Sequence, residues 1–157
     1  MRTRSLAVVA TAILIAALTT VAMAADPIVG TWKFNPAKSR MSQAPKERTE
    51  TYREIEGEQI ELTYAVIQQD GSRHLFKAAW PRVGGPVHVL QTGNDKVSYV
   101  EILLGPGNWY YVALQDGKET GVVHKTVSKD GKILEETVRW TDAQGKPHHE
   151  LVVLDKQ

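Results

Sequence analysis

The 157-residue sequence contains no cysteine, and this absence excludes several kinds of protein. Without thiols there is no disulfide framework, no thiol nucleophile, no cysteine-based zinc or iron–sulfur site, and no lipid-modified cysteine after an export leader. The fold must therefore be held together by a hydrophobic core. A chain of this length is long enough to bury such a core in a single domain.

The sequence also lacks a large net charge of either sign. The sequence has 19 Lys and Arg against 18 Asp and Glu, so its formal net charge is +1. Because a nucleic-acid or anionic-membrane partner requires a basic surface, neither is predicted. Common catalytic signatures such as G-x-S-x-G and H-E-x-x-H are also absent from the sequence. These absences argue against the most familiar nucleic-acid-binding and hydrolytic functions.

Long hydrophobic runs are rare, and the one that stands out lies at the start. The run Leu6–Leu18 follows Arg2 and Arg4 and precedes the small-residue motif Ala22-Met23-Ala24. This order is typical of a cleaved secretory signal peptide, which we place at residues 1–24. A membrane anchor needs about 17–25 apolar residues, more than this run provides. We therefore predict a bacterial periplasmic or secreted protein without a transmembrane anchor.

Short strand-like runs separated by turns fill the predicted mature domain, residues 25–157. Asp-Gly pairs at 70–71, 116–117 and 130–131 are strong hairpin signals, because the central residues of a type I′ turn need positive φ. The runs between the turns are rich in Val, Ile, Thr and aromatic residues. We predict an all-β fold, a single antiparallel up-and-down β-barrel of eight or nine strands. Residues 35–48 show no alternation and are expected to form a loop across one end.

The turn at Asp130-Gly131 predicts how its flanking strands pair. Counting outward from a two-residue turn places Lys125 directly opposite Glu136, and Val123 opposite Val138. Side chains alternate between the two faces of a strand, so these four residues share one face.

The turn at Asp116-Gly117 extends this face to a third strand. Counted in the same way, it places Tyr110 opposite Val123 and Val112 opposite Gly121. The resulting face is mostly apolar, and we predict that it is the barrel interior. Its apolar members are Tyr110, Val112, Leu114, Val123, Val127, Leu134, Val138 and Trp140. The hairpin at Asp70-Gly71 carries large apolar side chains on both faces, so its inward face stays open.

The start of the first predicted strand, Gly30-Thr31-Trp32, resembles the G-x-W signature of the lipocalins and the wider calycin barrels. In that family the tryptophan closes the barrel floor under a basic side chain near the end of the last strand. Lys156 is the matching residue here, so the resemblance implies a floor made by Gly30, Trp32 and Lys156. The stretch DPIVGTWKFNPAKSR, together with the C-terminal turns VSKDGK and TDAQGK, is similar to small secreted bacterial lipocalin-like domains of unassigned function.

Lys125 and Glu136 are the sharpest candidates for a functional site. Charges on an apolar face are costly to bury unless they are paired. The two residues therefore predict either a water-screened ion pair near an open barrel end or a polar handle inside a ligand-binding cup. The candidate ligand-binding residues are Tyr110, Val112, Lys125, Glu136, Val138 and Trp140.

His148-His149-Glu150 suggests a metal site, but neighbours on a strand point to opposite faces. At most two ligands would converge, so no metal and no cofactor is predicted. Haem bound by a single histidine, as in some related barrels, stays open, since nothing selects one of the five histidines.

Three functions remain after these exclusions. The leading one is an exported, monomeric binding protein that holds a small apolar or amphipathic molecule inside the barrel. The second is an isomerase- or cyclase-type enzyme with Lys125 and Glu136 as acid and base. The third is an interaction or inhibitor module that acts through its loops. A filled interior would favour the third function, and an open cavity with unpaired charges would favour the second.

Overall fold

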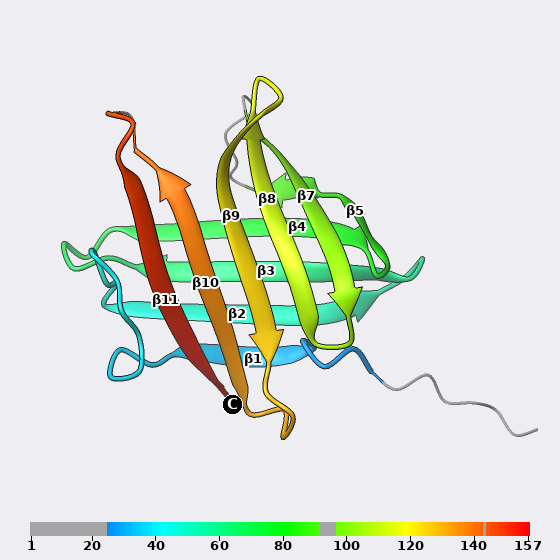
Figure 1. Cartoon of the computed structure of the whole chain (residues 1–157). Coiled ribbons are helices and arrows are strands. Elements are labelled where there is room, and N and C mark those ends of the chain that lie inside the picture. The colour runs from blue at the N-terminus through cyan, green and yellow to red at the C-terminus, as the bar shows by residue number, and fades with distance from the viewer. Residues whose placement is uncertain (1–24, 92–96, 143) are drawn as a thin grey trace, which may run out of the picture.

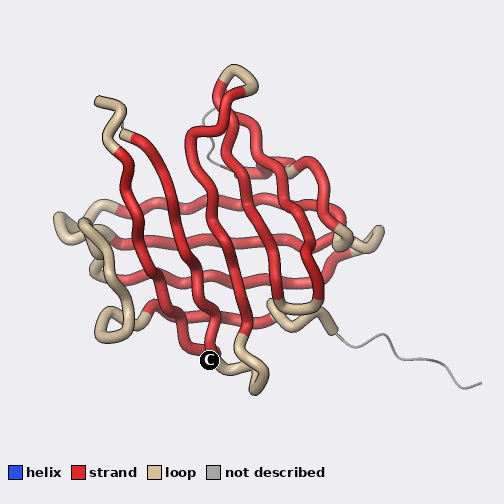
Figure 2. Tube along the Cα trace, viewed as in Figure 1, coloured by secondary structure: helices blue, strands red, loops and turns tan. Residues whose placement is uncertain are grey.

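The computed structural model describes residues 25–91, 97–142 and 144–157, so the predicted signal peptide lies outside the described part. These residues form eleven strands and no helix (Figures 1 and 2). No helix within the described ranges is therefore long and apolar enough to cross a membrane. The strands are β1 (Gly30–Phe34), β2 (Glu47–Ile55), β3 (Gln59–Ile67), β4 (Arg73–Pro81), β5 (Gly84–Pro86), β6 (His88–Gln91), β7 (Val97–Gly105), β8 (Asn108–Gln115), β9 (Lys118–Val127), β10 (Ile133–Thr141) and β11 (Pro147–Lys156).

All eleven strands belong to one antiparallel sheet, in the order β5-β7-β8-β9-β10-β11-β1-β2-β3-β4-β6. Strands that follow each other in the sequence mostly lie side by side, as the up-and-down prediction requires. The pairing of β1 with β11 curls the sheet back on itself. Strands β1–β4 thus form one layer and β7–β11 the other, and the two layers cross at a steep angle (Figure 1). The all-β, nearly closed barrel is confirmed.

The predicted strand number of eight or nine is wrong, because β5 and β6 add two short strands. β5 consists of Gly-Gly-Pro and pairs with β7, while β6 pairs with β4. Val87, between them, donates a backbone hydrogen bond of 2.9 Å to Tyr99. The segment 84–91 therefore joins the two free edges of the sheet in turn. The three residues of β5 show no alternation of apolar and polar side chains, so the sequence does not predict this closure.

The barrel floor is built around Trp32, whose side chain is fully buried. Its indole Nε1 donates a 2.7 Å hydrogen bond to the carbonyl of Ile28, and Lys156 pairs with it across β1 and β11. The Lys156 ammonium lies 4.9 Å from the centre of the Trp32 ring, within the range of a cation–π contact. The structure thus brings together the three residues that the G-x-W resemblance implies for the floor.

Gly30 is required at this position for two reasons. Its φ of 137° is one that residues with a side chain rarely adopt, and a Cβ there would lie 2.7 Å from Cε of Lys156. The glycine therefore leaves room for the lysine chain to cross over the tryptophan.

We predict that Gly30→Ala lowers the free energy of unfolding by about 1–3 kcal/mol, because it strains the backbone and displaces Lys156. Gly105→Ala is the matched control, since Gly105 has no positive φ and its added methyl would meet nothing within 4 Å. The control should stay within about 0.5 kcal/mol of the wild type in urea unfolding. Equal losses in both variants would contradict the role given to Gly30.

Candidate functional site

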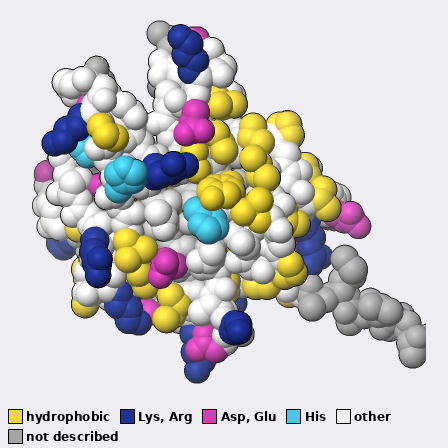
Figure 3. Space-filling view, viewed as in Figure 1, with side chains coloured by type: hydrophobic (Ala, Val, Ile, Leu, Met, Phe, Trp, Pro, Cys, Tyr) yellow, Lys and Arg dark blue, Asp and Glu magenta, His cyan; other side chains and the backbone are white. Residues whose placement is uncertain are grey.

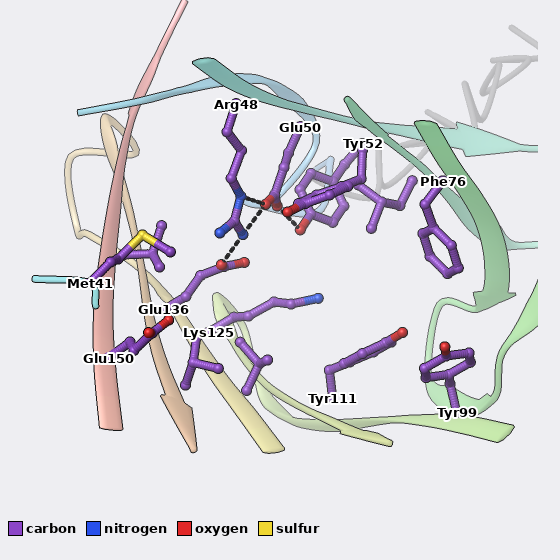
Figure 4. Close-up of a pocket in the computed structure, with 15 residues that line it drawn as sticks. Met41, Arg48, Glu50, Tyr52, Phe76, Tyr99, Tyr111, Lys125, Glu136 and Glu150 are labelled. Carbon is purple, nitrogen blue, oxygen red and sulfur yellow. Dashed lines mark hydrogen bonds and ion pairs between the residues drawn. The ribbon is translucent and has the colours of Figure 1, made fainter. Parts of the chain in front are cut away.

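A cavity of about 460 Å³ lies between the two layers above the floor. Side chains from eight strands and one loop line it (Figure 4). The lining residues are Met41, Arg48, Glu50, Tyr52, Leu62, Tyr64, Phe76, Tyr99, Tyr111, Val123, Lys125, Glu136, Val138, Glu150 and Val152. The barrel is therefore not filled by its own side chains.

The loop before β2 contributes to the wall of the cavity. Arg40 pairs with Leu151 on β11, beyond the point where β1 ends. Ser42 then donates hydrogen bonds from its backbone N and from Oγ to Oε1 of Glu150, at 3.2 and 2.6 Å. These contacts hold Met41, which lies between Arg40 and Ser42, against the cavity. The predicted loop at 35–48 is shorter than expected, because β2 already begins at Glu47.

Strand β2 places three polar side chains on the inner face. Arg48, Glu50 and Tyr52 occupy alternate positions, which point to the same side of a strand. All three are buried, and Glu50 and Tyr52 are each only 1 % exposed. Polar residues at alternate positions of a strand usually face solvent, but here this polar face of β2 points into the barrel.

Arg48 joins two carboxylates that come from opposite layers of the barrel. Its Nε donates a 2.7 Å hydrogen bond to Glu50, and its Nη2 donates to both Glu50 and Glu136. Glu50 also accepts a 2.6 Å hydrogen bond from the Tyr52 hydroxyl. Burial alone would raise the pKa of Glu50, but the nearby cations and this hydroxyl outweigh burial and lower it. Glu50 is therefore the ionised partner of the arginine.

Glu136 is in the opposite situation, although it contacts the same guanidinium. Burial is the main cause that raises its pKa, to about 7, and the negative charge of Glu50 acts in the same direction. Arg48 and Lys125 lower it without cancelling these effects. A carboxyl group with this pKa exchanges its proton near neutral pH.

Lys125 reaches into the cavity from β9 (Figure 4). Its Nζ makes a single long hydrogen bond, 3.3 Å to Oε1 of Glu101, among the described residues. Three aromatic rings surround the ammonium, with centres 5.0 Å away for Tyr111, 5.5 Å for Trp80 and 5.6 Å for Tyr52. Such rings attract a cation through their faces, but they leave its other N–H groups without acceptors.

The wall near β7 and β8 is aromatic. The rings of Tyr99 and Tyr111 are stacked, 5.4 Å apart, and Phe76 packs edge-on against Tyr99 at 5.9 Å. Burial raises the pKa of both tyrosines, so their hydroxyls stay neutral. Neither hydroxyl, nor that of Tyr64, has a hydrogen-bond partner among the described residues. The cavity therefore offers a flat apolar surface with polar groups along it.

The predicted pairing of Lys125 with Glu136 is confirmed, and both residues face the interior. They are 4 % and 2 % exposed, so water does not screen them. No salt bridge joins them in the described structure, because Glu136 pairs with Arg48 and Lys125 pairs with Glu101. Val138 also lines the cavity, as the register of the same hairpin predicts.

The register predicted for the hairpin before it is wrong. Tyr111, rather than Tyr110, pairs with Val123, and Val112 pairs with Val122. A bulge next to Ala113 shifts the pairing by one residue and moves alternate side chains to the other face. Tyr110 and Val112 therefore lie on the outer surface, where the Tyr110 ring stacks on His124 at 4.6 Å. Neither lines the cavity.

Trp140 has the expected register but does not line the cavity either. It lies near the end of β10, is 37 % exposed, and stacks on His148 with ring centres 4.1 Å apart. His148 in turn pairs with Asp142 at 2.9 Å. Within the described ranges, no group of three or more His, Asp or Glu side chains could hold a metal ion.

Sequence reasoning missed four important cavity or near-cavity residues: Arg48, Glu50, Glu101 and Tyr111. The first two lie on a strand that is polar on both faces, and Glu101 stands alone in an apolar run. For Glu101 the run itself was a usable signal, since a single charge inside a buried strand needs a partner. For Arg48 and Glu50, the sequence carried no sign that the strand turns this face inward.

Neither a known protein family nor a curated protein matches this sequence. The structure is similar to that of the fluorescent protein UnaG, with a TM-score of 0.55 and 16 % identity over 82 % of this chain and 96 % of that chain. A point mutant of UnaG gives a TM-score of 0.56 and 18 % identity over 83 % and 96 %. This similarity shows that the chain shares the β-barrel fold of UnaG.

Double-mutant cycles at pH 8 test the partners within the cluster. We expect Arg48→Met and Glu136→Gln to couple by on the order of 1–3 kcal/mol in urea unfolding, because one variant leaves the other residue's charge without its partner. Lys125→Met and Glu136→Gln should couple more weakly, since these two residues share no salt bridge. A stronger coupling for the second pair would contradict the geometry described above.

Proposed function

We propose that this protein is an exported binding protein that holds a small amphipathic molecule in the barrel cavity. The cavity itself carries this proposal. Its volume of about 460 Å³ lies within the range of about 300–1,000 Å³ typical of small-molecule sites. Export rests on the order of charged, apolar and small residues in the leader at 1–24.

The cavity has two chemically different parts, which match the two parts of an amphipathic molecule. Phe76, Tyr99 and Tyr111 supply an aromatic surface for an apolar, preferably flat, body. Arg48 and Lys125 supply N–H groups for a head group that carries hydrogen-bond acceptors. The head group should therefore lie close to the cations, with the body along the aromatic wall.

The two alternative functions have less support. A module that acts through its loops would not need an unfilled interior. An acid–base enzyme would need Lys125 as well as Glu136 to exchange a proton, whereas Lys125 is held in an ion pair with Glu101. A binding protein, in contrast, needs the unfilled interior and does not need Lys125 and Glu136 to act as acid and base.

A fluorescence titration with 8-anilinonaphthalene-1-sulfonate, an aromatic anion, tests the proposed function. Lys125→Met should weaken binding about 10–100-fold, because a hydrogen bond to a charged group contributes about 1.5–3 kcal/mol. Tyr111→Leu should also weaken it, since the ring forms part of the wall.

Tyr110→Leu is the matched control, because Tyr110 is the sequence neighbour of Tyr111 but lies on the outer face. It should leave the affinity unchanged. The outer face of β7 and β8 is partly apolar, with exposed Ile102 and Leu104 (Figure 3), so the dye could also adhere there. A loss in Tyr110→Leu with none in Tyr111→Leu would place the dye on that face and overturn the proposed function, as would no binding by the wild type.

A further inference from the structure

Five charged side chains are buried together inside the barrel, and their charges do not balance. Two are cations, Arg48 and Lys125, and three are carboxyl groups, Glu50, Glu101 and Glu136. With every group ionised, the cluster carries one more negative than positive charge. Such an imbalance is expensive in a buried site unless a proton or a counter-ion removes it.

The N–H groups that face the cavity nevertheless favour an anionic ligand. Arg48 uses Nε and Nη2 on its carboxylates, and its Nη1 has no hydrogen bond to a described residue. Lys125 has one long hydrogen bond, so two of its N–H groups are free. Both residues line the cavity, whereas the negatively charged Glu50 is already held by Arg48 and Tyr52.

An anion that binds to these N–H groups would make the charge imbalance worse by one unit. The site can accept it only if one carboxyl group becomes neutral at the same time. Glu136 is the group placed to do so, because it lines the cavity and shares the guanidinium of Arg48 with Glu50. Glu101 is also buried, burial raises its pKa, and its Oε2 has no hydrogen-bond partner among the described residues, but it does not line the cavity.

We propose that the cavity binds an organic monoanion, such as a carboxylate, together with one proton that Glu136 holds. This inference rests on the proposed binding function and adds the charge of the ligand and its coupling to pH. The proton comes from water, binds a carboxylate oxygen of Glu136, and leaves again when the anion dissociates. The charge of the site is then the same before and after binding.

The surroundings of Glu136 agree with this role. The charged and titratable groups that face it are Arg48, Glu50 and Tyr52 on β2, Tyr64 on β3, Lys125 on β9 and Glu150 on β11. Burial, with the charge of Glu50, raises the pKa of Glu136 to about 7 in the free protein. A bound anion adds a further negative charge nearby and raises this pKa again.

Proton uptake can be measured by calorimetry in phosphate and in Tris buffer, whose ionisation enthalpies differ. The probe is 8-anilinonaphthalene-1-sulfonate, whose sulfonate stays ionised, so any proton taken up belongs to the protein. We expect uptake close to one proton per dye at pH 8 and close to zero at pH 5.5, where Glu136 is already protonated. The Kd should rise up to tenfold per pH unit above about 7.

Two controls assign the proton. N-phenyl-1-naphthylamine has the same rings without the sulfonate, and it should bind to the wild type with no proton uptake at either pH. Glu136→Gln should bind the sulfonate dye with no uptake at pH 8, because the amide cannot be ionised.

The outcomes separate this inference from the proposed function. Tight binding of the sulfonate dye without proton uptake at pH 8 would overturn the inference and leave the binding function intact. Uptake that persists in Glu136→Gln would overturn the role of Glu136. Absence of dye binding at every pH would overturn the proposed function itself.

Discussion

The hydrogen bond from Arg48 to Glu136, which is a salt bridge whenever Glu136 is ionised, is the interaction on which the interior of this barrel depends. It joins β2 in one layer to β10 in the other, across the space that a hydrophobic core would otherwise fill. Both side chains are buried, so neither can exchange the other for water without a large loss of stability. The pairing fixes the distance between the layers at this point and leaves a cavity beside it.

The contact between Arg48 and Glu136 also explains why the interior is divided into a packed apolar floor and a cavity. Below the charged cluster, apolar side chains such as Trp32, Leu134 and Leu154 close the floor, and all three are fully buried. Level with the cluster, charged groups must keep their hydrogen-bond partners and cannot be packed to the density of a core. The cavity and the packed apolar floor are thus two results of one sequence pattern, in which the inward positions change from apolar to charged.

The sequence was sufficient to predict strand pairing where the turn alone sets the register. The Asp130-Gly131 turn correctly places Lys125 opposite Glu136, because nothing interrupts the ladder between β9 and β10. The same reasoning failed one hairpin earlier, since Thr120 is inserted as an extra residue opposite Ala113 and turns Tyr111 inward in place of Tyr110. Partners contributed by distant strands, such as Arg48, were also out of reach, because local pairing says nothing of what lies across a barrel.

The pKa of Glu136 in the free protein tests this account most directly. Side-chain carboxyl resonances of ¹³C-labelled glutamate, assigned by comparison with Glu136→Gln, report the pKa during a pH titration. The account predicts a midpoint of about 7 for Glu136, because burial and Glu50 together outweigh the attraction of Arg48 and Lys125. A midpoint near 4.5, the ordinary value for glutamate, would contradict the buried and charge-imbalanced cluster described here.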